Sequence, residues 1–204
     1  MRNAIVLDLE TARSADDCRH CGHPEDAHVT STLAGGNYCP PGQMRTGYER
    51  LGWENKAALG LSIGCYYDYR DIRIHWFDVH TLEKTVRHLV ETQPLLVSFN
   101  GIAFDFPLMR GLLRQTAETL AHAGDHLERQ AGEGLAQLCD AFKAQCASSY
   151  DILNEIWEVE PDNRYVRGLN SLDAICQASG LGAKLSHGAQ APRDWRDGLY
   201  AKVL

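Results

Sequence analysis

Two carboxylates, Asp8 and Glu10, lie at the end of a short apolar run that begins at Ala4. Side chains alternate across a strand, so a strand here would point both carboxylates to the same side. Like charges at that spacing raise each other's pKa unless a cation lies between them. Carboxylate pairs of this kind bind hard divalent ions such as Mg²⁺ and Mn²⁺. The pattern predicts part of a metal site; the alternative is a strand end with two solvated acids.

A third carboxylate, Asp105, follows a second apolar run, Pro94 to Phe99, and an Asn100-Gly101 turn. Aspartate is favoured at helix N-caps and proline in the first helical turn, so Asp105 ahead of Pro107 is also explained as a cap. Ligands gather at the carboxyl ends of strands in open α/β sheets. Asp105 is therefore a candidate to complete the metal site that Asp8 and Glu10 begin.

The chain has seven cysteines, and three of them cluster with histidines in residues 12–50, a stretch with no apolar period. Three thiolates and one imidazole are a common closed tetrahedral zinc set, usually begun by a Cys-x2-Cys pair. Zinc would give this loop the order that it otherwise lacks. His20 and His23 compete for the histidine position, and free thiols in a loop are the alternative to a metal site. The predicted ligands of one structural Zn²⁺ are Cys18, Cys21, His28 and Cys39.

Apolar periodicity predicts the elements that must position these residues. Strands and helices alternate, with three strands before the first helix, which indicates an α/β fold with a mixed sheet flanked by helices. Gly124, Gly132 and Gly134 are expected to break the stretch from Leu113 to Phe142 into two helices. The predicted strands are Ala4 to Leu9, Ala58 to Tyr67, Ile72 to Phe77 and Pro94 to Phe99, and helices are predicted over Leu82 to Val90, from Pro107, from Ser171 and from Pro192.

Asp8-x-Glu10-Thr11 and Asn100-x3-Phe104-Asp105 together resemble the first two motifs of the DEDD superfamily of 3′–5′ exonucleases. The likeness is to the predicted-exonuclease branch related to the proofreading domain of family B DNA polymerases. Two further segments, Ser149 to Leu153 and Ser171 to Cys176, are similar to later landmarks of that branch. The resemblance covers nearly the whole chain except the loop 12–50, expected to be a zinc-binding insertion, and a helical insertion over 114–146.

The resemblance implies a single domain over residues 1–204 with the ribonuclease H-like fold. It implies hydrolysis of single-stranded nucleic acid from a 3′ end, DNA more than RNA, with two Mg²⁺ or Mn²⁺ ions about 4 Å apart. In that scheme Asp8 bridges the ions, Glu10 holds the ion that activates water, and Asp105 holds the other. Thr11 and Asn100 position the terminal nucleotide.

The family's third motif is missing from this sequence. That motif supplies a fourth carboxylate preceded by Tyr four residues earlier or by His five residues earlier, on a C-terminal helix. None of the candidate acids, Asp151, Asp173, Asp194 and Asp197, has such a predecessor. We expect the chain to end just before the motif. The missing acid favours the rival hypothesis, a non-catalytic nucleic-acid- or protein-binding module on the same fold; a third is a zinc-dependent adaptor built on residues 12–50.

Composition limits how this chain can hold nucleic acid. Twenty Lys and Arg against 27 Asp and Glu give a formal net charge of −7, the opposite of a protein that binds phosphates by charge alone. Bound cations, a local basic patch or a protein partner must then meet the phosphates. No apolar run reaches the ~20 residues of a membrane span, and the N-terminal run is too short for a signal peptide, so we expect no membrane partner and a cytoplasmic location.

Overall fold

The computed structural model describes residues 3–24, 29–31, 36–38, 48–163, 166, 169–182 and 190–199. Two predicted zinc ligands, His28 and Cys39, lie outside these ranges. No helix within the described ranges is long and apolar enough to cross a membrane.

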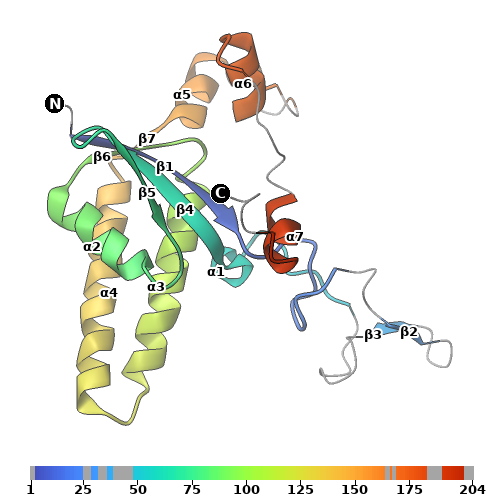
Figure 1. The fold of residues 1–204 in the computed structure, drawn as a ribbon, viewed down its shortest axis with the longest axis vertical. Helices are drawn as coiled ribbons and strands as arrows, with labels where there is room; N and C mark the ends of the chain where they lie inside the picture. Colours follow the sequence, from blue (N-terminus) through green and yellow to red (C-terminus); the bar gives the residue numbers. More distant parts are fainter. Residues whose placement is uncertain are drawn as a thin grey trace.

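A five-stranded mixed sheet forms the centre of the fold (Figure 1). Its first strand, β1 (Ala4–Thr11), lies in the middle, and β4 (Leu61–Asp68) and β5 (Arg73–Phe77) add to one side as an antiparallel meander. On the other side β6 (Leu95–Ser98) and β7 (Tyr150–Asp151) run parallel to β1. The order β5-β4-β1-β6-β7 confirms the predicted α/β class with a mixed sheet.

The three parallel strands fix where the functional residues meet. The register pairs Val6 with Val97 and Ser98 with Asp151, so β1, β6 and β7 end at the same edge of the sheet. Asp8 and Glu10 lie in the last part of β1, and the loop after β6 leads directly to Asp105. This shared edge is the structural reason that residues about one hundred positions apart come together.

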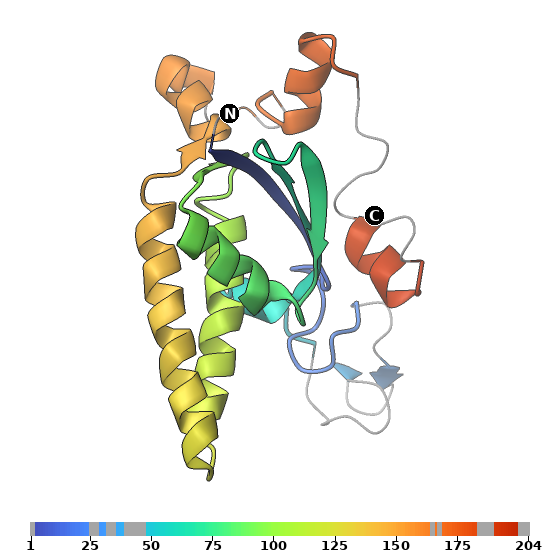
Figure 2. The ribbon, with the colours of Figure 1, turned by 60° about the vertical axis from the view of Figure 1, so that its left-hand side comes forward.

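One face of the sheet is covered by three helices, as Figure 2 shows. These are α2 (Leu82–Thr92), α3 (Asp105–Ala121) and α4 (His126–Cys146), and a short helix, α1 (Lys56–Leu59), packs on α3. Alternation along β1 buries Ile5, Leu7 and Leu9 beneath these helices, in the main core. The even-numbered residues of β1, Asp8 among them, therefore point to the opposite face.

The remaining elements lie around the ends of the sheet. A two-stranded ribbon, β2 (Val29–Ser31) and β3 (Gly36–Tyr38), falls within the insertion after β1. Helix α7 (Ala191–Arg196) is held to the start of this insertion by an ion pair of 2.6 Å between Arg196 and the buried carboxylate of Asp17. The other C-terminal elements are α5 (Ile152–Val159), the 3₁₀ turn η2 (Pro161–Asn163), α6 (Leu172–Ala178) and α7 (Ala191–Arg196).

Two details differ from the sequence predictions. Helix α1 occupies the first part of the run predicted as a strand from Ala58, and the strand itself begins at Leu61. Gly132 and Gly134 do not break α4, which begins after an N-cap at Asp125. A Cβ at Gly132 would lie 2.8 Å from the carbonyl oxygen of Ala117, so this glycine allows α3 and α4 to approach closely.

Candidate functional site

Asp8 and Glu10 project from the face of β1 that the helices leave open. Asp8 is exposed, Glu10 is half-buried, and Asp8 pairs across the ladder with Cys65 of β4. Burial raises the pKa of the Cys65 thiol to about 11, and the negative charges of Asp8 and Glu10 act in the same direction. Both carboxylates therefore lie on one side of the strand and within electrostatic reach of the same thiol, as the alternation predicted.

Asp105 is the buried member of the group. It retains 3% of its accessible surface, and burial raises its pKa to about 8, with Asp8, Asp151 and Glu10 adding repulsion in that order. The N-cap of α3 is Phe104 and makes no side-chain cap, so Asp105 is the first helical residue rather than the cap. The structural explanation that the sequence left open for Asp105 does not hold.

The turn that delivers Asp105 is tightly constrained. Asn100 has a φ of 65°, in the left-handed region, and a Cβ at Gly101 would lie 2.3 Å from Ser98 Oγ and 3.2 Å from Asp105 Oδ2. Only glycine fits at position 101, because any side chain there would displace either Ser98 or Asp105. The Asn-Gly pair thus brings the backbone close beneath the Asp105 carboxylate.

Asp151 holds this turn in place from the neighbouring strand. Its Oδ1 accepts hydrogen bonds from the backbone N–H groups of Asn100, at 2.9 Å, and Leu153, at 3.1 Å. Its Oδ2 accepts a third from the N–H of Ile102 at 3.0 Å, and the residue is only 3% exposed. A buried carboxylate with three backbone donors joins the end of β7, the start of α5 and the turn before α3.

A cavity of about 520 Å³ opens at this edge of the sheet. Of the predicted site residues, Asp8, Asn100 and Asp105 line it, and Glu10 reaches the site through its charge on Asp105. Thr11 follows a register shift in the β1–β4 ladder and is not among the lining residues. The other residues that line the cavity are Leu9, Phe99, Phe104, Leu153, Ser171, Leu172 and Asp173.

Asp173 is a carboxylate that sequence reasoning left out of the metal site. It stands in the first turn of α6, which Ser171 caps by accepting a hydrogen bond of 3.2 Å from the N–H of Ala174. Gln177 donates a hydrogen bond of 2.8 Å to the Asp173 carboxylate. The helix start was readable from the Asn-Ser-Leu-Asp sequence, but its position beside Asp8 depends on how the chain returns to the sheet.

The donor set suits a hard divalent cation. Asp8, Glu10 and Asp105 offer carboxylate oxygens, and a cation would relieve the repulsion that, after burial, raises the Asp105 pKa. Within the described ranges, no three Asp, Glu, His or Cys side chains are already grouped as a metal would require. Metal binding at this edge therefore calls for rotation of these side chains toward a common centre.

The predicted zinc ligands are only partly within view. Cys18 is fully buried and Cys21 is half-buried in the turn that follows β1. His28 and Cys39 belong to the part of the chain outside the described residues.

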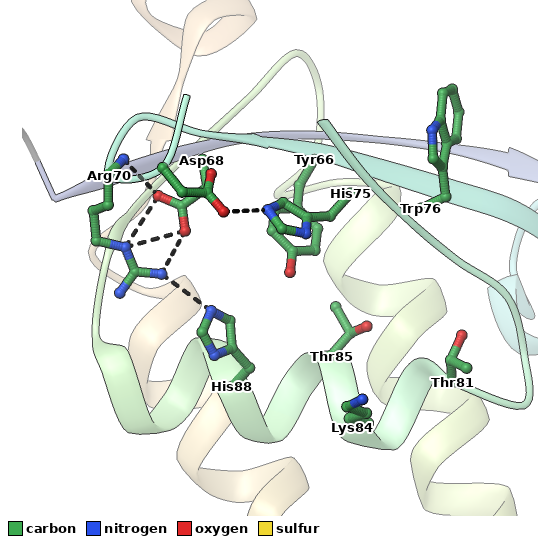
Figure 3. A pocket seen from close by; sticks show the side chains of 10 residues that line it. Tyr66, Asp68, Arg70, His75, Trp76, Thr81, Lys84, Thr85 and His88 are labelled. Carbon is green, nitrogen blue, oxygen red and sulfur yellow. Dashed lines mark hydrogen bonds and ion pairs between the residues drawn. The ribbon is translucent and has the colours of Figure 1, made fainter. Parts of the chain in front are cut away.

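A larger cavity, of about 640 Å³, lies at the opposite end of β4 between the β4–β5 hairpin and α2 (Figure 3). Four of its polar side chains form two pairs: Arg70 contacts both carboxylate oxygens of Asp68, and His75 contacts Asp71 at 2.8 Å. No predicted site residue lines it. We attribute these four side chains to internal pairing and not to the chemistry at the other edge.

A scan against protein-family models gives no match, and searches of curated proteins and of solved structures give none either. The site is therefore interpreted from its own residues.

Proposed function

We propose that this chain forms the core of a metal-dependent 3′–5′ exonuclease that hydrolyses single-stranded nucleic acid, DNA in preference to RNA. The observation that carries the proposal is the convergence of Asp8, Glu10 and Asp105 from two separate strand ends onto one edge of the sheet. The mixed five-stranded sheet, in which β4 runs antiparallel to β1, is compatible with the ribonuclease H-like fold that the motif resemblance implies. The proposal thus unites a fold, a carboxylate set and a cavity.

Two bound Mg²⁺ or Mn²⁺ ions would supply an activated water and charge stabilisation at the leaving 3′ oxygen. Asp8, between the other two acids in the scheme, would contact both ions, with Glu10 and Asp105 each holding one. Asp105 must lose its proton to do so, because its pKa of about 8 leaves it largely protonated at neutral pH in the metal-free protein. Asp151 keeps the Asn100–Ile102 turn fixed while this happens.

The cavity suits the last nucleotide of a strand rather than a long stretch of backbone. Phe99 and Phe104 line it beside Asn100, which gives aromatic surface for a terminal base and an amide for hydrogen bonding. The chain carries a net charge of −7, so a long anionic strand gains little attraction from the protein outside the metal centre. Binding at the 3′ end is where cations and aromatic surface act together.

The test is an exonuclease assay of the purified protein on a 5′-labelled single-stranded oligodeoxynucleotide, with Mg²⁺, Mn²⁺ or EDTA. We expect stepwise shortening from the 3′ end that requires divalent metal and disappears in Asp8→Ala. Asp140→Ala, an exposed acid on α4 paired with Arg114, is the matched control and should keep full activity. An active Asp8→Ala variant would show that the site is elsewhere.

An inactive wild-type protein that still binds single-stranded DNA would support the rival hypothesis of a non-catalytic module. A binding assay distinguishes the two cases. If binding of single-stranded DNA requires metal and is lost in Asp8→Ala, the carboxylates bind metal but do not catalyse hydrolysis.

A further inference from the structure

The two carboxylates in the cavity between the β4–β5 hairpin and α2 are engaged within the protein. Asp68 accepts a hydrogen bond of 2.8 Å from the backbone N–H of Arg70, in addition to the contacts from the Arg70 guanidinium. Asp71 accepts a hydrogen bond of 3.1 Å from the backbone N–H of Arg73, in addition to its contact with His75. The strongest acceptors of the lining are therefore already used, and a ligand has to be recognised mainly by hydrogen-bond donors.

Two buried hydroxyl groups in the same cavity lack a protein partner. Tyr66 and Thr85 both line the cavity, and each is only 8% exposed. In Figure 3 the phenol of Tyr66 points from the sheet toward α2, and Thr85 projects from α2 toward the sheet. Neither hydroxyl forms a hydrogen bond with any residue that the structure describes. Buried hydroxyl groups are normally paired, so these two mark a place where a bound molecule would supply an acceptor.

The ionisation of Tyr66 keeps it a donor. Burial raises the pKa of the Tyr66 hydroxyl, and the charges of Asp68 and Asp71 act in the same direction. The phenol therefore holds its proton at neutral pH and can donate it to an oxygen of a ligand.

Lys84 and His88, both on α2, add donors to the lining. The Lys84 side chain is exposed and makes no ion pair with any of the described residues. Nη2 of Arg70 lies 3.0 Å from Nε2 of His88. A guanidinium can only donate, so Nε2 of His88 is the acceptor and the imidazole proton is on Nδ1. The lining thus offers an unpaired cation and several neutral donors, which together suit an anion.

The size of the cavity indicates more than a simple ion. Its volume of about 640 Å³ is within the range of pockets that hold small organic molecules. The rings of Tyr66 and His75 are stacked, with centroids 4.8 Å apart and planes at 15°, so aromatic surface lies beside the donors. A phosphate group has three terminal oxygens, which is enough to accept from one ammonium group and two hydroxyl groups at once.

We propose that this cavity binds a small phosphomonoester, with the phosphate held by Lys84, Tyr66 and Thr85. The organic part of the ligand lies beside the stacked rings of Tyr66 and His75. Lysine binds phosphate as a compact point charge, and the two hydroxyl groups give the contact its direction. The cavity lies apart from the carboxylate edge, so this inference does not depend on the proposed exonuclease activity.

The experiment is isothermal titration of the purified protein with AMP and with glucose-6-phosphate, with adenosine and glucose as phosphate-free probes. EDTA is present throughout, so that metal at the carboxylate edge contributes nothing. We expect saturable binding of at least one phosphomonoester in the millimolar range or below, and no binding of adenosine or glucose over the same range. Lys84→Gln, Tyr66→Phe and Thr85→Val should each weaken that binding by roughly tenfold.

Lys84→Gln is the decisive variant, because an exposed side chain can be replaced without disturbing the core. Its matched control is Lys143→Gln, in the last turn of α4 and outside the cavity, which should bind as the wild type does. Asp8→Ala should also bind normally. Circular dichroism checks that every variant is folded.

Three outcomes would overturn the proposal. The first is a wild-type protein that binds neither phosphomonoester, and the second is equal affinity for AMP and adenosine. The third is binding that is unchanged in Lys84→Gln or lost in Asp8→Ala, since either result would place the ligand outside this cavity.

Discussion

Two predicted metal sites, the carboxylate edge (Asp8, Glu10, Asp105 and Asp151) and the cysteine knuckle (residues 18–23), are built in opposite ways. The edge gathers Asp8, Asp105 and Asp151 from three strand ends separated by most of the chain, and only the topology of the sheet brings them together. The knuckle places Cys18 and Cys21 within one turn closed by its own backbone hydrogen bonds. Asp105, whose pKa is raised to about 8, lies at the first, and Cys18, whose pKa is lowered to about 6, lies at the second.

The difference teaches where each site draws its stability. Burial and then repulsion raise the pKa of Asp105 to about 8, so a hard cation at the edge would have to displace the proton of that carboxyl group. At the knuckle the pKa of Cys18, about 6, favours the thiolate, which is the form that the predicted zinc would bind.

The largest expected effect separates the two sites by function. Glu10→Gln removes a charged ligand from the edge, so we expect exonuclease activity to fall by about 10³-fold, because metal-borne charge stabilisation is worth several kcal/mol. Zinc content should stay at one per chain. Cys21→Ser should do the reverse, with zinc lost and activity reduced far less. Turnover and elemental analysis on the same samples provide the measurement; matching losses of both in either variant would mean that the sites are one unit.

Next in size is the expected loss of folding stability in Asp151→Ala. The substitution leaves the backbone N–H groups of Asn100, Ile102 and Leu153 without their acceptor, and unpaired buried donors cost roughly 1–3 kcal/mol each. We expect unfolding free energy to drop by roughly 3 kcal/mol or more, since partial rehydration limits the sum. Urea denaturation measures it. Asp151→Asn, which keeps one acceptor oxygen, should recover part of the loss, and Asp140→Ala should change little.

The sequence was sufficient for the parts of the site that follow directly from strands. Alternation along β1 placed Asp8 and Glu10 on one side, and the strand–Asn-Gly–Asp pattern placed Asp105 at the same edge. It was insufficient for Asp151, because β7 spans only two residues and its three hydrogen bonds exist only once β7 lies beside β6. Nor does the sequence reveal the register shift that follows Glu10 and precedes Thr11.

Glycines show the same limit in the fold. Gly124 lies in the predicted break between two helices, whereas Gly132 serves the close approach of α3 and α4 inside one helix. Both glycines stand in a helical sequence pattern, and only the packing of the adjacent helix distinguishes their roles. At Gly101, in contrast, the Asn-Gly pair predicts the turn from the sequence, and the close contact with Ser98 in the structure gives the reason for the glycine.

A further effect concerns pH. The pKa of Asp105 is about 8 in the folded, metal-free protein and ~3.9 in an unfolded chain, so the folded state holds an extra proton between about pH 4 and 8. Its unfolding free energy should therefore fall as pH rises through that window. Asp105→Asn removes this dependence, and we expect its stability relative to wild type to rise with pH over this window, by at most about 1.4 kcal/mol for each pH unit.

Thermal unfolding in EDTA at a series of pH values tests this expectation. Adding Mg²⁺ should stabilise wild type more at pH 8 than at pH 6, because the cation competes with the Asp105 proton. A wild type whose stability relative to Asp105→Asn rises with pH would contradict the raised pKa.

The smallest predicted effect is that of Gly22→Ala in the knuckle, compared with Gly134→Ala in α4. At Gly22 the φ of 73° is costly for any residue with a Cβ, although the nearest atoms, in the Arg13 side chain, lie 3.4 Å from where that Cβ would be. Gly22→Ala should thus cost about 1 kcal/mol of backbone strain without a steric clash. If that strain falls on the metal-bound knuckle, zinc affinity drops by roughly fivefold.

Gly134→Ala is the matched control: it lies inside α4 with open space around it, so alanine should stabilise the helix by roughly 0.5–1 kcal/mol and leave zinc affinity unchanged. Chelator competition measures the affinities, and an unaltered zinc affinity in Gly22→Ala would show that the left-handed turn is not needed to present the two thiolates.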